Sequence, residues 1–212
     1  LNIKFLRRNF KMKKILSMAL TLAIVLSTVI SASAYEVQPI SGNVDIPSNY
    51  INQPLLIHSK ADNKSGHSLN ILANSQAAIA NNKNVTTWPT VKSDTLQQWK
   101  ILKIDGTDKY YRIANTIEPT YSLDYYWGSN NYQNCQIFSY PLNSKSYDDY
   151  AVTFRNESGF YTYGIVKVRS DSSTEYALTV TNNVVAGSGY DVRWISAPQS
   201  GNIQIWKLER LS

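Results

Sequence analysis

Cysteine and histidine are almost missing from this chain of 212 residues. Cys135 is its single cysteine, so no intrachain disulfide can form and packing must hold the fold together. The two histidines, His58 and His67, belong to no H-E-x-x-H motif, and the sequence has neither a G-x-S-x-G motif nor a phosphate-binding glycine loop. These absences disfavour an enzyme, a metal site and a bound cofactor. We interpret Cys135 as a small apolar filler and both histidines as solvated loop residues.

One long hydrophobic run is present, near the beginning of the chain. Two lysines precede an apolar run over residues 15–30, and an A-S-A triplet ends at Ala34. Residues 1–34 are therefore predicted to be a signal peptide that is cleaved after Ala34, with Met12 as the true start. The run is short for a membrane span, which needs roughly 20 residues. We expect a secreted, extracellular protein with no stable membrane insertion.

Excess positive charge is confined to this leader. The whole chain has 21 basic and 15 acidic residues, but six of the basic residues and none of the acidic ones lie in residues 1–34. The remainder has 15 residues of each sign and is neutral. Because it has no basic field, no nucleic-acid partner is expected.

Aromatic and small polar residues, by contrast, are abundant. All 15 tyrosines and all five tryptophans lie beyond residue 34, together with many Asn, Ser and Thr. Tyr, Thr and Val favour strands, whereas Asn, Ser and Gly favour turns, and no segment there has convincing helical periodicity. The sequence predicts an all-β protein with one domain and its own core.

Two landmarks recur with the same long period. The leucine of a short strand-like segment recurs after 54 and 55 residues, at Leu69, Leu123 and Leu178. A closing aromatic residue recurs after 55 and 52 residues, at Trp99, Phe154 and Trp206. Self-similarity of this kind indicates a repeated architecture.

Each period can be divided into four strand-like segments between turn-rich stretches. The first segments span 54–59, 110–115 and 164–170, the second 68–71, 122–125 and 177–180, the third 84–89, 135–141 and 191–196, and the fourth 96–101, 150–155 and 203–208. A repeat that cannot bury its own apolar face must pack on its copies. Three copies of four strands close most naturally into a barrel that is capped by hairpins.

We therefore predict a β-trefoil over residues 50–212, with repeats at about 50–104, 105–157 and 158–212. A linear solenoid is an alternative, although solenoids usually have shorter periods and more copies. A two-sheet sandwich is another, but it leaves the threefold period unexplained. Residues 35–49 form an arm outside the repeats, which is interpreted as either a tether or an added edge strand.

Two of the three repeats close with a Q-x-W motif. The motif positions are Gln97 and Trp99 in the first repeat, Val152 and Phe154 in the second, and Gln204 and Trp206 in the third. With the leucine strand and a third strand that ends in an aromatic residue, this pattern resembles the ricin-B-type lectin repeat over about residues 50–211. Residues 110–125 are also similar to small clostridial haemagglutinin components that share this fold.

The resemblance implies a mainly architectural role for Q-x-W. The indole fills the core under the barrel cap, and the glutamine amide bonds to neighbouring backbone. Alternation along a strand agrees with this, because it places Gln97 and Trp99 on one face. We expect Trp99 and Trp206 to matter for stability rather than for binding.

The resemblance places sugar recognition on other residues. An exposed aromatic face takes the C–H side of a pyranose, and a carboxylate or amide after the leucine fixes its hydroxyls. Carried over by position, the candidates are Asn70 with Trp88, Asp124 with Phe138 or Tyr140, and Thr179 with Trp194, near Asn202. In any single repeat, the aromatic residue could equally be a half-buried strand residue with no contact to a ligand. The recurrence of an aromatic residue at the same position of all three repeats favours the binding interpretation.

The three candidate pockets are unequal. Asp124 offers a carboxylate, whose charge strengthens each hydrogen bond with a sugar hydroxyl, so the second pocket has the best polar group. The first pocket has Leu96 where the family often has a polar contact. The loss of the acid at Thr179 predicts a weak or silent third pocket.

Two functions are predicted from these patterns. The first is a secreted, non-catalytic lectin that binds galactose-type or related glycans or glycoproteins through shallow pockets. The alternative is a protein-binding β-trefoil, either a protease inhibitor or a subunit of a secreted toxin or haemagglutinin complex. A loop would then carry the function, with residues 118–120, the segment near Trp127, which is expected to be exposed, or the arm 35–49 as candidates.

Overall fold

The computed structural model describes residues 43–62, 64–107, 109–127, 133–142, 147–157, 160–168, 174–197 and 202–212. No side-chain position is described for residues 126, 127, 133, 147 and 148. The predicted signal peptide, the first part of the arm and the side chain of Trp127 thus lie outside the described residues. The described residues fall within one compact unit, Gln38–Ser212.

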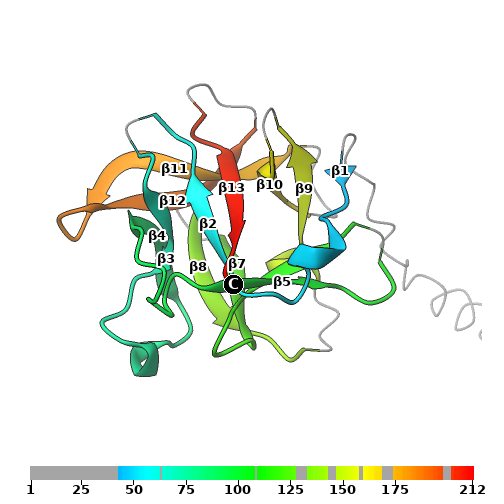
Figure 1. Ribbon diagram of the computed structural model, residues 1–212, viewed down its shortest axis with the longest axis horizontal. Helices are drawn as coiled ribbons and strands as arrows, with labels where there is room; N and C mark the ends of the chain where they lie inside the picture. The colour runs from blue at the N-terminus through cyan, green and yellow to red at the C-terminus, as the bar shows by residue number, and fades with distance from the viewer. Residues whose placement is uncertain are drawn as a thin grey trace, which may run out of the picture. The chain divides into compact units, whose positions relative to one another are not determined.

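Strands make up most of this unit (Figure 1). They are β1 (Asn43–Val44), β2 (Leu55–Ser59), β3 (His67–Ile71), β4 (Lys83–Pro89), β5 (Trp99–Lys103), β6 (Tyr111–Asn115), β7 (Tyr121–Trp127), β8 (Gln133–Ser139), β9 (Val152–Asn156), β10 (Thr162–Lys167), β11 (Tyr176–Val185), β12 (Gly189–Ser196) and β13 (Ile205–Arg210). Each of the twelve predicted strands overlaps one of β2 to β13, which confirms the all-β prediction.

Short helical segments connect some of these strands. They are the 3₁₀ turns η1 (Ser48–Tyr50) and η2 (Gln76–Ala78) and the α-helix α2 (Tyr147–Tyr150). The sequence predicts only a loop around α2. A helix of four residues is too short to produce a helical period, so periodicity alone does not reveal it.

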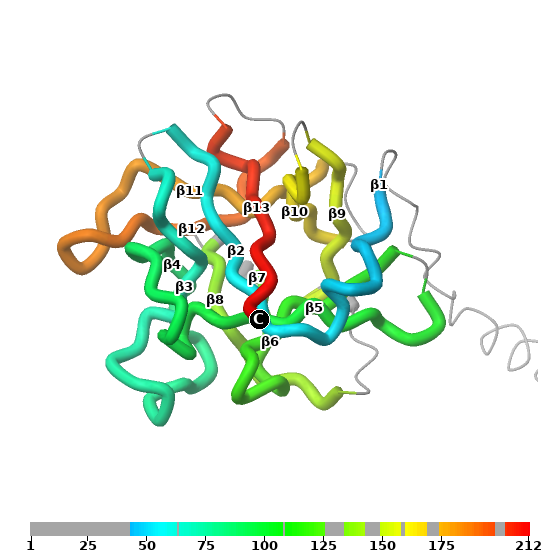
Figure 2. The backbone as a smooth tube through the Cα atoms, in the orientation of Figure 1, coloured from blue at the N-terminus to red at the C-terminus, as the bar shows by residue number. Residues whose placement is uncertain are grey.

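Six of the strands close into a barrel. Their antiparallel pairs are β2–β5, β5–β6, β6–β9, β9–β10, β10–β13 and β13–β2. Figure 2 shows that the last strand, β13, runs between β2 and β10. The last strand, β13, therefore pairs with β2, the first strand of the ring. This pairing closes the barrel.

Six further strands form three hairpins, β3–β4, β7–β8 and β11–β12. The hairpins meet one another because β4 pairs with β8 and with β12, and β12 pairs with β8. Leu69, Leu123 and Leu178 lie in these hairpins, and all three are fully buried in the core. The repeated leucine of the sequence is thus the core contact of each hairpin.

The Q-x-W residues are architectural, as the resemblance implies. Trp99 and Trp206 are both 0% exposed. Each indole Nε1 donates to a leucine backbone oxygen at 2.9 Å, from Trp99 to Leu69 and from Trp206 to Leu178. The same kind of hydrogen bond therefore joins β5 to the β3–β4 hairpin and β13 to the β11–β12 hairpin.

The described end of the arm is an added edge strand. β1 pairs antiparallel with β9, where Val44 stands opposite Phe154. The Tyr111 hydroxyl donates to Asp45 Oδ1 at 3.1 Å, and the Ile46 side chain is buried in the core. Residues 43–44 thus form the added edge strand, which is one of the two interpretations of the arm. Ile46 shows that the hydrophobic core also includes a residue before position 50.

The histidines lie in strands, so the prediction of solvated loop residues is wrong. His58 Nε2 lies 2.8 Å from Glu209 Oε2, and its Nδ1 lies 3.0 Å from Ser68 Oγ. Burial lowers the pKa of His58, and the hydrogen bond with Glu209 acts in the opposite direction. Ser68 is 0% exposed and no substrate can reach its hydroxyl, so this Glu–His–Ser chain joins β13, β2 and β3 rather than forming a nucleophile.

Candidate functional site

The pairing of strands in the three hairpins shows which side chains point into the core and which point outward. The recurring leucines stand opposite Thr87, Ile137 and Trp194, and all of these side chains are buried. Opposed residues point to the same side of a sheet, and the next residue points to the other side. The equivalent outer positions in β4, β8 and β12 are therefore Trp88, Phe138 and Ile195.

Trp194 is a core residue. The prediction that its ring is exposed and stacks on a sugar is therefore wrong. Its side chain is 0% exposed, and its Nε1 donates to the backbone oxygen of Asp124 at 3.1 Å. Trp88 precedes Trp99 by 11 residues, whereas Trp194 precedes Trp206 by 12. One residue of difference turns a strand side chain to the opposite face.

The third hairpin presents no sugar-binding geometry on its described residues. Thr179 is fully buried, and its hydroxyl donates to Ala177 O at 2.8 Å and accepts from Gln204 Nε2 at 2.9 Å. Asn202 is an exposed turn residue with a positive φ of 57°. The structure therefore does not bring Thr179, Trp194 and Asn202 together on an open surface.

The second hairpin closes over Asp124. Only 5% of Asp124 is exposed, and the Tyr140 hydroxyl donates to its Oδ1 at 2.5 Å. The Tyr140 ring packs on Phe138 and Tyr150, with ring centroids 5.3 and 4.9 Å apart. A sugar would have to displace Tyr140 to reach the carboxylate. The residues predicted for the second pocket are thus brought together, but they bond to one another.

Burial and hydrogen bonding act on the charge of Asp124 in opposite directions. Burial raises the pKa of Asp124, and the hydrogen bond from Tyr140 acts in the opposite direction. Burial and the bond to Asp124 also raise the pKa of Tyr140 strongly, so its hydroxyl remains a donor.

Arg112 fixes the strand end that carries Tyr140. Besides Ser122 Oγ, it donates to three backbone oxygens at 2.5 to 3.1 Å, those of Thr120, Tyr140 and Pro141. In the first hairpin Gln97 Nε2 makes the related bond to Pro89 O at 3.0 Å. Val152 cannot make it in the second, so an arginine from β6 supplies the missing contacts.

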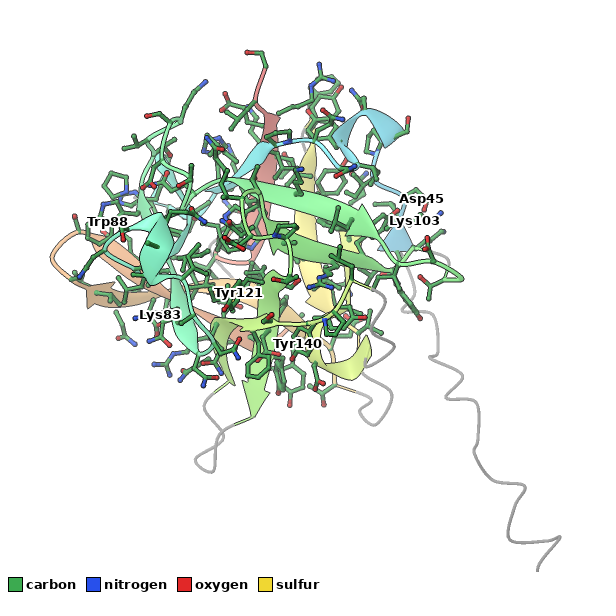
Figure 3. The ribbon with its side chains drawn as sticks, turned by 90° about the horizontal axis from the view of Figure 1, so that it is seen from below. Asp45, Lys83, Trp88, Lys103, Tyr121 and Tyr140 are labelled. Carbon is green, nitrogen blue, oxygen red and sulfur yellow. The ribbon has the colours of Figure 1, made fainter. Side chains whose placement is uncertain are left out.

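An open pocket of about 370 Å³ lies on the first hairpin. Its lining includes Asn70 and Trp88, the two residues predicted for the first site. Figure 3 shows Trp88 well separated from Tyr140 on the second hairpin. The first candidate pair therefore faces a space that a ligand can enter. The other residues that line this space include Gln76, Asp94, Leu96 and Ala186.

The β11–β12 hairpin, from a distant part of the chain, pairs with β4 of the first hairpin (Figure 1). Ala186, at its tip, lines the pocket. Gly189 packs against Trp88 so closely that an added Cβ would lie 2.5 Å from the indole Cε3. Lys64 Nζ donates to Asn182 Oδ1 at 2.8 Å and ties the hairpin to the first lobe. The position of Trp88 thus depends on a glycine that is 101 residues away in sequence.

Most of the lining residues were not predicted from the sequence, and Asp94, Gln76 and Ala186 are among them. Asp94 supplies a polar group beside Leu96, where the pattern indicated only an apolar contact. A carboxylate shortly before Q-x-W was the available signal. Gln76 and Ala186 come from η2 and from another hairpin, and no local pattern pointed to them.

Within the described ranges, no group of three or more His, Cys, Asp or Glu side chains is placed to hold a metal ion. No helix among the same residues is long and apolar enough to cross a bilayer.

Comparison with known proteins gives matches at the level of structure. No protein-family model and no curated protein matches the chain. The designed threefold-symmetric protein ThreeFoil matches with a TM-score of 0.56 and 21% identity, over 74% of this chain and 99% of that one. A structure described as BEL β-trefoil matches with a TM-score of 0.54 and 12% identity, over 80% and 99%.

A lectin is among the structural neighbours. The Polyporus squamosus lectin, solved with a human-type influenza-binding epitope, matches with a TM-score of 0.52 and 12% identity over 82% of this chain. The chain spans about half, 51%, of the length of that lectin. At such identities the likeness concerns the fold alone. The neighbours include ricin-B-type β-trefoil lectins, and the described unit has the β-trefoil fold.

Proposed function

We propose that this protein is a non-catalytic carbohydrate-binding lectin whose open site is the pocket on the first hairpin. The observation that carries the proposal is the convergence of Trp88, Asn70 and Asp94 on one space of about 370 Å³. An indole face with nearby oxygen acceptors suits the C–H side and the hydroxyls of a pyranose. Glycan binding by a neighbour with this fold supports the same function.

We further propose that the chain has a threefold repeat and that it is secreted. The chain consists of three four-stranded repeats, β2–β5, β6–β9 and β10–β13, and the equal register of the three leucines supports this division. The leader pattern supports secretion of the part beyond Ala34. Galactose-type sugars are the proposed ligands, because the resemblance is to ricin-B-type repeats.

The test is direct titration of galactose into the protein, with Trp88→Ala as the variant. Loss of the stacking surface is expected to weaken binding about tenfold or more, since aromatic contacts contribute roughly 0.5–1.5 kcal/mol beyond their area. Phe138→Ala is the matched control, because Phe138 holds the same register position in the closed second hairpin. It should bind like the wild type.

Equal loss in both variants would contradict the assignment to the first pocket. A glycan array on the protein covers other sugars, and binding to none of them would overturn the lectin proposal. The protein-binding alternative would then gain weight, with the loop at 118–120 as its described candidate. Circular dichroism of each variant confirms that the change has not unfolded it.

A further inference from the structure

Three side chains that line the first pocket, Asn70, Gln76 and Asp94, each keep an oxygen with no hydrogen bond among the described residues, while Asn74 and Ser75 in the same lining also carry donors. The amide Nδ2 of Asn70 donates to Ile71 O at 2.9 Å, so this nitrogen is committed to the backbone. A carbonyl oxygen can only accept, so the bond fixes the orientation of the amide. Asn70 Oδ1 is left for a ligand, and no donor among the described residues bonds to it.

Gln76 is oriented in the same sense. Its Nε2 donates to Asn115 Oδ1 at 3.2 Å. That oxygen also accepts from the backbone N–H groups of Ile117 at 3.1 Å and Glu118 at 3.0 Å, so its identity as an oxygen is fixed. Gln76 Oε1 is consequently turned the other way, and it is buried without a hydrogen-bond partner among the described residues. A second amide oxygen thus lacks a donor.

Asp94 adds negative charge to this acceptor set. Its Oδ1 accepts from Leu96 N at 2.9 Å, which anchors the carboxylate and leaves Oδ2 available. The described residues that line the pocket include no Lys, Arg or His. No salt bridge to Asp94 is present among the described residues. The pocket therefore has an uncompensated carboxylate beside an indole.

We propose that this pocket selects an amino sugar, a hexose whose primary amine is unacetylated and protonated. Two acceptor groups, from Asn70 and Asp94, line the pocket together with Trp88 and can accept from N–H donors of an ammonium group, and an indole is the best cation–π partner. A carboxylated or sulfated sugar meets like charge there and is excluded. The inference rests on the proposed lectin function and names the ligand class of the same site.

The experiment compares sugars of one stereochemistry that differ in charge. Galactosamine, galactose, N-acetylgalactosamine and galacturonate are titrated into the wild-type protein by calorimetry at pH 6, where the amine is protonated. Galactosamine should bind about tenfold more tightly than galactose, because a charge-assisted hydrogen bond is roughly twice as strong as a neutral one. Galacturonate should bind most weakly. Raising the salt concentration should reduce the advantage of galactosamine.

Asp94→Asn tests whether the pocket is responsible. Asparagine retains the oxygen that accepts from Leu96, so the loop is kept while the charge is removed. The preference for galactosamine over galactose should then fall to about twofold or less. Asp105→Asn removes an exposed aspartate outside the pocket and should keep the full preference.

The possible results separate the inference from the function on which it rests. Equal binding of galactose and galactosamine would overturn the amino-sugar inference and leave the lectin proposal intact. A galactosamine preference that survives in Asp94→Asn would also overturn it, because the attraction would then be non-specific. If none of the four sugars binds and the glycan array shows no binding, the lectin proposal itself fails.

Discussion

Asp124 combines a hydrogen bond with an unfavourable burial of charge. Its carboxylate accepts from Tyr140 while only 5% of the residue is exposed. Burial raises its pKa, and the positive charge of Lys167 offsets part of that rise. The folded protein therefore binds a proton at Asp124 more readily than the unfolded chain does.

We predict that Asp124→Asn removes a pH-dependent loss of stability. Because the native pKa is raised above the ordinary value of about 3.9, the wild type loses stability relative to the variant as pH rises from about 4 to 7. Asparagine keeps an oxygen that accepts from Tyr140. Chemical denaturation of both proteins across this range measures the difference in free energy of unfolding. A wild type that gains stability relative to the variant as pH rises would contradict the prediction.

Tyr140→Phe gives an independent check on the same residue. The bond from Tyr140 lowers the pKa of Asp124, so its removal should raise that pKa further. The Tyr140→Phe variant is then expected to lose stability more steeply than the wild type over the same pH range. An unchanged slope would show that the hydrogen bond does not govern the carboxylate.

At the scale of elements, the β11–β12 hairpin is both a part of the cap and a support for the first pocket. Its Tyr190 stands opposite Thr87 of β4, and Lys64 lies over the Tyr190 ring at 5.0 Å. His67 meets the same ring edge-on at a centroid distance of 5.3 Å. These contacts bring Gly189 against Trp88 and hold it there.

We predict that Gly189→Ala weakens sugar binding although Gly189 is not among the pocket residues. A Cβ there would lie 2.5 Å from Trp88 Cε3 and 2.7 Å from Thr87 O, so the indole must shift. Overpacking of this kind costs about 1–3 kcal/mol of stability, and a displaced platform should reduce affinity about tenfold. Calorimetric titration with galactosamine and thermal unfolding measure both effects.

Ser188→Ala is the matched control in the same hairpin. Ser188 is exposed, and its contact with His67 Nε2, at 3.2 Å, is made by the backbone oxygen, which alanine retains. This variant should bind and unfold like the wild type. Equal affinities for Gly189→Ala and Ser188→Ala would show that the hairpin does not position Trp88.

At the scale of the whole molecule, three related hairpins have three different surfaces. The first has an open pocket beside Trp88. In the second Tyr140 covers Asp124, and in the third Ile195 stands at the platform position while Thr179 is buried. The three hairpins thus differ at equivalent positions, and the open pocket beside Trp88 lies on the first of them.

We predict a stoichiometry of one sugar per chain. Single shallow sites commonly bind at about millimolar Kd, roughly −4 kcal/mol, so calorimetry with galactosamine at high protein concentration is the suitable measurement. A monomeric chain should gain little avidity from a bivalent ligand, because a second site is needed for an intramolecular contact. Two or three sites per chain would show that the closed hairpins open for ligand.

Local patterns predicted the fold because they reflect local physics. The alternation of side chains along a strand and the recurrence of Leu69, Leu123 and Leu178 predicted the strands, the buried indoles and the β-trefoil. The polar–aromatic pair at Asn70 and Trp88, which the sequence placed in one candidate site, lines one pocket. Each of these signals depends on residues that are close in sequence or repeat at a fixed period.

Only the tertiary structure decided which positions are open. Trp194 differs from the platform position by one residue, and strand pairing, which fixes its face, is set by a partner strand. Tyr140 covers Asp124, and Gly189 supports Trp88, through contacts between side chains that are packed together only after the hairpins dock. The sequence by itself determined the elements and their repetition, and long-range packing determined the site.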